Sequence, residues 1–226
     1  MDFDALAAQW DDNPIRRGLT EALAKAMSKA LPQTGMSTAL EIGCGTGTLA
    51  LTLAGRFERI LATDASLGMV EQLNRKLAET PVDGTIEPMH IDLLTTPPPP
   101  GRYDLVYSAM ALHHVEDAGR LVSVMAELVR RGGVAIVADL SPEDGSFHAP
   151  ETVPHNGIAE AQLREWFGVN DLTTRSCETV HTISKGGRDY PVFLAVASRD
   201  PALTGAVFRG DPCAPVDADD WPEDLR

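Results

Sequence analysis

The hydrophobic pattern of the chain switches repeatedly between two periods. Short apolar runs predict buried strands, whereas apolar residues three and four positions apart predict amphipathic helices. Strands are predicted at 38–42, 59–63, 84–91, 103–108 and 134–140. Helices are predicted between them at 46–55, 66–80 and 118–131, the last of these stopped by Gly132-Gly133. This alternation is typical of an α/β fold with a mostly parallel sheet and crossover helices on both faces.

Both ends of the chain depart from this alternation. Residues 2–31 predict two short helices, broken at Asn13-Pro14, that cover the rest of the domain. After the fifth strand, residues 141–157 form a Pro- and His-bearing segment that is longer than a simple connection needs. A helix is predicted at 162–167, followed by two β-rich runs at 172–183 and 190–198 that form a hairpin. We therefore expect one domain over residues 1–200 and an acidic tail over 201–226.

Pro88 lies inside the third predicted strand. Proline has no backbone N–H and cannot donate to a strand ladder. The strand at 84–91 is therefore expected at an edge of the sheet.

Composition narrows the class of protein. The chain has 226 residues, 43% of them hydrophobic, which is enough for one domain with a full core. Cys44, Cys177 and Cys213 lie far apart without a CxxC pair, so we expect reduced thiols and a cytoplasmic location. The acidic N-terminus does not resemble a signal peptide, and no apolar run is long enough to span a membrane.

The net charge of −14 bears on the choice of partner. Nucleic acids and anionic membranes are bound by clustered Lys and Arg, whereas the only basic pairs here have acidic neighbours. We therefore expect no nucleic acid and no membrane partner. A neutral or cationic small molecule meets no long-range repulsion. The sequence does not indicate the oligomeric state.

The segment LEIGCGTG, residues 40–47, carries the strongest chemical signal. It follows an apolar strand and opens a helix, the context in which a glycine loop binds a ligand. Glycines let the backbone turn tightly and approach a ligand without a Cβ in the way. The spacing is G-x-G-x-G, with Thr48 where the dinucleotide fingerprint has its last glycine. Taken alone, the segment could also be a tight turn that binds nothing.

Two acidic residues accompany the loop. Asp64 ends the second predicted strand, and Asp92 follows the third. Either could be a helix cap or a turn residue. With Glu41 and the glycine loop, however, their spacing resembles the class I S-adenosylmethionine-dependent methyltransferases. YDLVYSAMALHHV and LVRRGGVAIVADL resemble the motifs of the fourth and fifth strands of that family.

The resemblance implies a Rossmann-like seven-stranded sheet of order 3-2-1-4-5-7-6, with the last strand antiparallel, and S-adenosyl-L-methionine as cofactor. It places Asp64 at the ribose hydroxyls, Asp92 at the adenine amino group and Met69 against adenine. The residues that it implies for the cofactor site are Glu41, Gly43, Cys44, Gly45, Gly47, Asp64, Ala65, Met69, Asp92, Leu93 and Ser108. The expected function is methyl transfer to a small-molecule acceptor. The alternatives are a non-catalytic protein that binds S-adenosylmethionine and a nicotinamide-dependent oxidoreductase.

Four histidines are candidates for the acceptor side. His113 and His114 follow the fourth strand, where they could orient the acceptor or act as base. His148 and His155 lie in segment 141–157, which we expect to form a lid with both side chains facing the cavity. No metal site is predicted, because Asp139, His148 and His155 lack the spacing of a metal motif. Cys44 is expected to pack rather than react.

Overall fold

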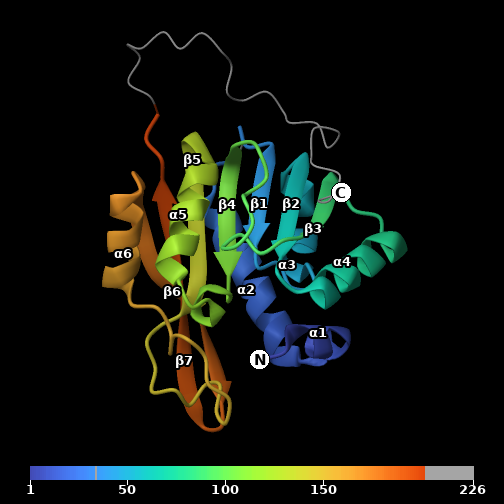
Figure 1. Cartoon of the computed structure of the whole chain (residues 1–226), viewed down its shortest axis with the longest axis vertical. Helices are drawn as coiled ribbons and strands as arrows, with labels where there is room; N and C mark the ends of the chain where they lie inside the picture. The colour runs from blue at the N-terminus through green and yellow to red at the C-terminus, as the bar shows by residue number, and fades with distance from the viewer. Residues whose placement is uncertain (34, 202–226) are drawn as a thin grey trace.

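One seven-stranded sheet organises the computed structural model, which describes residues 1–33 and 35–201 (Figure 1). The strand order is β3-β2-β1-β4-β5-β7-β6, as predicted. Strands β1 to β5 pair in parallel, and β7 runs antiparallel to both β5 and β6. The strands are β1 (Thr38–Ile42), β2 (Arg59–Asp64), β3 (Thr85–His90), β4 (Tyr103–Ala109), β5 (Val129–Leu140), β6 (Thr173–Lys185) and β7 (Arg188–Ser198).

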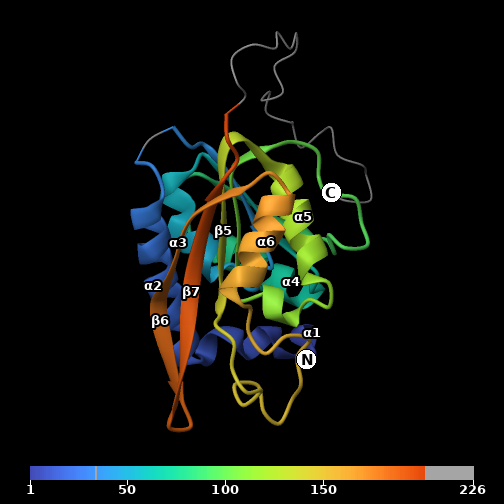
Figure 2. The ribbon, with the colours of Figure 1, turned by 90° about the vertical axis from the view of Figure 1, so that its left-hand side faces the viewer.

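Helices cover both faces of the sheet (Figure 2). One hydrophobic core lies between the sheet and helices α2 and α3, and the second lies under α5 and α6. Helix α4 packs beside β2 and β3. The helices are α1 (Phe3–Leu6), α2 (Pro14–Ala30), α3 (Thr48–Leu53), α4 (Leu67–Glu79), α5 (Ala118–Leu128) and α6 (Glu160–Val169), with short 3-10 segments η1 (Ala7–Asp12), η2 (Ala54–Arg56) and η3 (Leu112–His114).

The N-terminal helices break where the sequence predicted. The Asn13 side chain accepts a hydrogen bond from the Ile15 N–H at 2.9 Å, and Pro14 occupies the first turn of α2. This cap starts a new helix because proline needs no hydrogen-bond partner there. Helix α2 has 17 residues, so it is longer than predicted. It buries Leu19, Leu23, Ala24 and Met27 against the sheet, while α1 and η1 contact α4.

The strand with the internal proline lies at an edge, as predicted. Strand β3 is terminal in the strand order, and Pro88 stands opposite Ala62 of β2. The other edge is β6, which forms a hairpin with β7 through Gly186-Gly187. Within residues 1–33 and 35–201, none of the helices combines the length and apolar character needed to cross a bilayer.

The predicted helix at 118–131 is wrong at its C-terminal end. Helix α5 ends at Leu128, and β5 begins at Val129, which is fully buried and paired with Tyr103. The register then shifts, so that Leu105 pairs with Val134. Gly132-Gly133 therefore lies in an irregular part of β5 rather than at a helix end. Burial of the β-branched Val129 in the sheet outweighs the local helical pattern.

Residues 141–157 contain turns but no helix or strand, and they lie beneath the carboxyl edge of the sheet together with α1 (Figure 1). We call them the 141–157 loop. Side chains of the hairpin hold it in place: Arg188 pairs with Asp144 at 2.5 Å, and the Ser146 and Tyr190 hydroxyls are 2.7 Å apart. The predicted acidic tail lies outside the described residues, apart from its first position.

Candidate functional site

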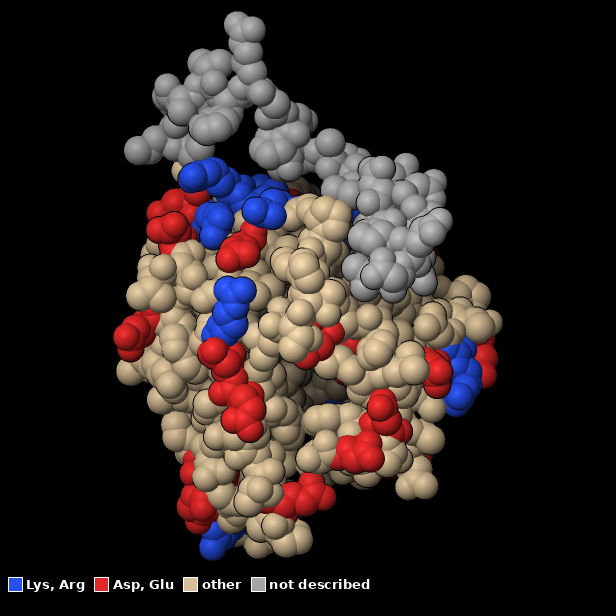
Figure 3. All heavy atoms as spheres, in the orientation of Figure 1, with Lys and Arg blue, Asp and Glu red and all other residues tan. Residues whose placement is uncertain are grey.

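A large cavity opens at the carboxyl ends of the parallel strands. Its volume is about 1040 Å³. The loops after β1, β2, β3 and β4, the N-terminal segment and the 141–157 loop all contribute to its lining. Figure 3 shows a hollow in the middle of one face, with acidic side chains among those around it. The edge of an open α/β sheet at which the strands end is the usual position of a ligand site.

The glycine loop closes one end of this cavity. The Gly43 and Cys44 N–H groups both donate to the Thr63 carbonyl at 2.9 Å, which fixes the turn after β1. Gly43 has φ +73°, and a Cβ at this position would lie 2.6 Å from the Cβ of Ala111. A side chain at residue 43 is therefore excluded by backbone conformation and by space.

Asp64 links the glycine loop to the start of α4. One carboxylate oxygen accepts the Gly45 N–H at 2.7 Å, and the other accepts the Ser66 N–H at 2.9 Å. The cap of α4 is Ser66 rather than Asp64, because the Ser66 hydroxyl accepts the Met69 N–H. Each carboxylate oxygen has a second lone pair, so Asp64 can still accept hydrogen bonds from a ligand. Burial raises the pKa of this carboxyl.

Asp92 stabilises the turn after β3 and also lines the cavity. It accepts hydrogen bonds from the Leu94 N–H and the Thr95 hydroxyl, both at 2.9 Å. Asp92, Leu93 and Ala65 are all part of the cavity lining. The two alternatives considered for Asp92, a turn residue and a ligand residue, are therefore compatible.

Glu41 and Cys44 are buried groups at the same end. The Tyr107 hydroxyl donates to Glu41 at 3.1 Å, and burial raises the Glu41 pKa from 4.5 to about 8. A carboxyl of this kind is neutral at pH 7 unless a cation lies beside it. Burial also raises the pKa of the Cys44 thiol well above its ordinary value. Cys44 is therefore a packing residue, as expected, rather than a nucleophile.

Five of the predicted site residues do not line the cavity that the described residues form: Gly45, Gly47, Met69, Ser108 and His155. Gly45 and Gly47 act on the shape of the loop. Both have positive φ, and a Cβ on Gly47 would lie 2.3 Å from the Leu73 side chain. Met69 is buried within α4, so the structure does not support the predicted contact of its side chain with adenine. Ser108 is also buried, inside β4.

His113 occupies the opposite end of the cavity, and Asp139 orients it. The His113 Nδ1 lies 2.5 Å from an Asp139 oxygen, and both side chains are buried. The carboxylate also accepts the Leu140 N–H at 2.7 Å. This pair was not predicted from the sequence. The pairing follows from the register of β4 and β5, in which Ala109 stands opposite Ala138. His113 comes shortly after the end of β4, and Asp139 lies near the end of β5, so the two residues meet at the same edge of the sheet.

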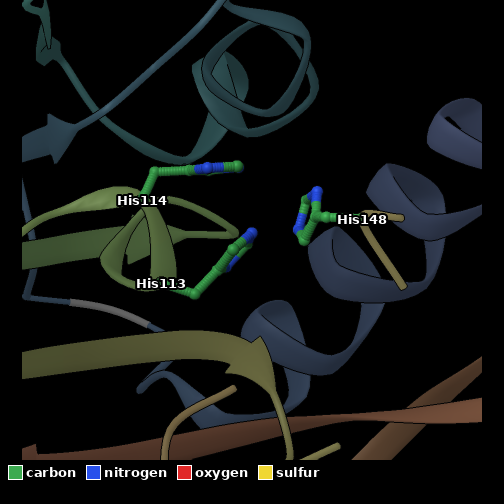
Figure 4. A group of neighbouring side chains, drawn as sticks. All are labelled: His113, His114 and His148. Carbon is green, nitrogen blue, oxygen red and sulfur yellow. The ribbon is translucent and has the colours of Figure 1, made fainter. Parts of the chain in front are cut away.

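His114 and His148 complete a group of three rings, shown in Figure 4. The His113 and His114 ring centroids are 4.0 Å apart, and each lies 5.0 Å from the His148 centroid. Burial, with the neighbouring histidines, lowers the His114 pKa to about 3 and the His148 pKa to about 4. Both rings are therefore neutral at pH 7. We call His113, His114 and His148 the histidine cluster.

The prediction that His155 faces the cavity is wrong. Its Nε2 lies 3.0 Å from the Val115 carbonyl, and its backbone N–H donates to the His113 carbonyl at 3.2 Å. These bonds turn the ring toward η3 and the residue after it. His155 therefore attaches the 141–157 loop to η3, while His148, from the same loop, faces the cavity as predicted.

The N-terminal segment covers both ends of the cavity. Phe3 packs edge-on against His114, with centroids 5.0 Å apart. Asp11 pairs with Lys76 at 2.6 Å, and Lys76 also donates to the Thr46 carbonyl of the glycine loop at 2.8 Å. The sequence predicted a helical cover but not the parts of the cavity over which it lies. The contacts with the glycine loop depend on tertiary packing that the helical pattern does not specify.

Comparisons with known proteins agree with this geometry. Residues 39–133 match a family model described as a methyltransferase domain. An uncharacterized methyltransferase of Mycobacterium tuberculosis is 32% identical over 161 residues, covering 70% of this chain and 79% of that protein. The ubiquinone biosynthesis O-methyltransferase of Caulobacter vibrioides is 29% identical over 155 residues, and the match covers 62% of this chain and 61% of that protein.

Solved structures share the fold. The magnesium protoporphyrin IX methyltransferase of Synechocystis PCC 6803, crystallised with S-adenosylhomocysteine, superposes with a TM-score of 0.62 at 22% identity, covering 81% of this chain and 84% of that one. The match to methyltransferases favours methyl transfer over the oxidoreductase alternative. The sheet order, the family match and the 32% identity to the Mycobacterium tuberculosis methyltransferase, of which 79% is covered, all agree. This chain belongs to the class I S-adenosylmethionine-dependent methyltransferases.

Proposed function

We propose that the chain transfers the methyl group of S-adenosylmethionine to an oxygen or nitrogen atom of a neutral or cationic small molecule. One observation carries this proposal: a single cavity joins the glycine loop, Asp64 and Asp92 to the histidine cluster. The glycine-loop end suits the cofactor, and the histidine end suits the acceptor. The O-methyltransferase among the relatives supports an acceptor with a hydroxyl group.

The residues at the glycine-loop end fit the cofactor chemically. Asp64 has free lone pairs for ribose hydroxyls, and Gly43 and Cys44 of the glycine loop line the same end of the cavity. The cofactor supplies a methyl group on a positively charged sulfur. Glu41 is a buried carboxyl whose raised pKa would return toward its ordinary value beside a positive charge. The Glu41 carboxyl can therefore supply a negative charge when a cation binds beside it.

The acceptor must be held in line with the methyl group and away from water. Such orientation supplies roughly 7–11 kcal/mol of barrier reduction. In the transfer, the acceptor atom forms a bond to the methyl carbon while the bond from sulfur to that carbon breaks, and sulfur keeps the electron pair. An acceptor hydroxyl must also release its proton. The histidine cluster lies in the cavity at the acceptor end and can promote this loss.

Substitution of Asp64 tests the cofactor end. Asp64→Ala removes a charge-assisted contact of about 1.5–3 kcal/mol, so affinity for S-adenosylmethionine should fall at least tenfold by calorimetry. Asp64→Asn removes the charge and keeps an acceptor oxygen for only one of the two backbone N–H groups, so it should also bind weakly. Asp117→Ala, which removes the cap of α5, is the matched control outside the cavity.

Unchanged affinity in a folded Asp64→Ala protein would contradict the assignment. Formation of S-adenosylhomocysteine from the labelled cofactor and fractionated metabolites tests turnover. A protein that binds the cofactor but never forms this product would support the non-catalytic alternative.

A further inference from the structure

The histidine cluster places three ring nitrogens close together. One nitrogen from each of His113, His114 and His148 lies within 4.8 Å of the others. Figure 4 shows His113 and His148 facing each other across a gap, with His114 on one side of it. Two of the rings come from η3 and the third from the 141–157 loop, so the tertiary fold brings them together.

Two of these nitrogens are buried without a partner. The Nε2 atoms of His113 and His148 have no hydrogen-bond partner in the part of the chain that the structure describes. A buried nitrogen without a partner is unfavourable, so such atoms are rare unless a ligand pairs them. The Nδ1 of His113 donates to Asp139, which directs Nε2 toward the cavity.

The arrangement of Asp139 behind His113 is characteristic of metal ligands. A histidine that binds a metal through one nitrogen usually donates its other N–H to a carboxylate or carbonyl, which fixes the tautomer and the ring orientation. Imidazole nitrogens are also donors that zinc, copper, iron and nickel prefer, whereas magnesium and calcium prefer oxygen.

We propose that His113, His114 and His148 bind one divalent transition-metal ion of the zinc type, with a coordination position left open toward the acceptor. The open position suits an oxygen or nitrogen donor of the acceptor, a consequence that rests on the proposed function. Three protein ligands and one open position are the pattern of catalytic rather than structural zinc sites.

The distances require a small closure of the site. With metal–nitrogen distances of about 2.0–2.1 Å, two ligand nitrogens of a tetrahedral site are about 3.4 Å apart. The present spread of up to 4.8 Å is therefore wider than a loaded site. His148 belongs to a loop without helix or strand, so it is the ligand that can move inward. Metal binding should draw the 141–157 loop toward η3.

The alternative is a site without metal, in which His113 takes the proton released by the methyl acceptor and Asp139 holds the His113 ring in place. His114 and His148 would then be packing partners. The two cases differ in a property that does not depend on turnover. Only the first requires stoichiometric binding of a transition metal.

Metal titration of the protein distinguishes them. The full chain, freed of metal by a chelator and dialysis, is titrated with Zn²⁺ in a calorimeter and with Co²⁺ in a visible-absorption spectrometer. We expect one ion per chain, visible bands of a low-coordinate Co²⁺ site, and no comparable binding of Mg²⁺.

Two variants of the same loop provide the control. His148 makes no hydrogen bond through its buried Nε2, so His148→Ala should fold. Its Zn²⁺ affinity should fall by at least about 100-fold, because loss of even a hydrogen-bond partner of a metal ligand costs about 10–100-fold. His155→Ala removes the loop histidine outside the cavity and should leave Zn²⁺ affinity within about twofold.

Absence of stoichiometric Zn²⁺ binding would overturn the proposal, as would equal affinities in the two variants. Binding of S-adenosylmethionine is measured on the metal-free protein in parallel. If it persists while Zn²⁺ does not bind, the metal site fails and the proposed function stands. If it is lost with Asp64→Ala while one Zn²⁺ still binds per chain, both the cofactor site and the metal site are supported.

Discussion

The two ends of the cavity differ in how their polar groups are satisfied. At the glycine loop, the Asp64 carboxylate and the Thr63 carbonyl both accept backbone N–H groups, so the loop is held before a ligand arrives. At the histidine cluster, two ring nitrogens lack partners within the described residues, and one ring comes from an irregular loop. The first end is preorganised, and the second needs a ligand or a movement to complete it. Recognition of the cofactor should therefore tolerate little change, whereas the acceptor end should adapt.

The largest effect should come from breaking the rigid end at Gly43. Gly43→Val introduces a side chain at φ +73° and 2.6 Å from Ala111, so we expect destabilisation of about 2–5 kcal/mol. Binding of S-adenosylmethionine should become undetectable by calorimetry. Gly18→Val is the control, because no atom lies within 4 Å of a Cβ at that helical position. Gly43→Ala, with a smaller clash, covers the case in which the valine variant does not fold. Normal binding in either variant would show that the loop is not rigid.

Glu41 gives the rigid end a pH dependence of stability. Between its ordinary pKa of 4.5 and the folded value of about 8, the folded protein keeps a proton that the unfolded chain has released. The free energy of unfolding should therefore fall as the pH rises through this range, by at most about 1.4 kcal/mol per pH unit. Glu41→Gln cannot ionise, so its stability relative to the wild type should increase toward pH 8. Urea unfolding at several pH values measures this difference.

Glu79→Gln, on the exposed end of α4, is the control for the Glu41 experiment. Parallel stability curves for Glu41→Gln and the wild type would mean that the buried carboxyl is already ionised in the folded protein.

The smallest effect should come from His155, which attaches the adaptable end to η3. His155→Ala removes one partly buried hydrogen bond to the Val115 carbonyl, worth about 0.5–1.5 kcal/mol. Chemical unfolding should detect this loss, while affinity for the cofactor stays unchanged. His181→Ala on β6 removes a histidine that does not line the cavity and serves as control. A tenfold loss of cofactor affinity in His155→Ala would show that the two ends are coupled.

The sequence predicts the rigid end better than the adaptable one because the former is built from local signals. The strand, the glycine turn and the following helix lie within residues 38–53, and Asp64 closes the next strand. The pairing of His113 with Asp139 depends on the register between β4 and β5, and His148 reaches them along an irregular path. No periodicity encodes such a path, which is why His148 and His155 received the same prediction but have different environments.

The error at the end of α5 has a similar cause. Residues 118–131 carry a continuous helical pattern, yet Val129 enters the sheet because its burial there depends on Tyr103, far away in sequence. Pro88, by contrast, was placed correctly because a missing N–H restricts a strand wherever it occurs.

The position of the 141–157 loop has a consequence for how this enzyme could change its substrate. The methyltransferase-domain match ends at residue 133, so it includes the glycine loop, Asp64, Asp92 and η3 but stops before Asp139 and the loop. The loop contributes His148 and Phe147 to the cavity and is held by the hairpin of β6 and β7. A change confined to this loop should therefore alter the acceptor end of the cavity while leaving the residues of the glycine-loop end as they are.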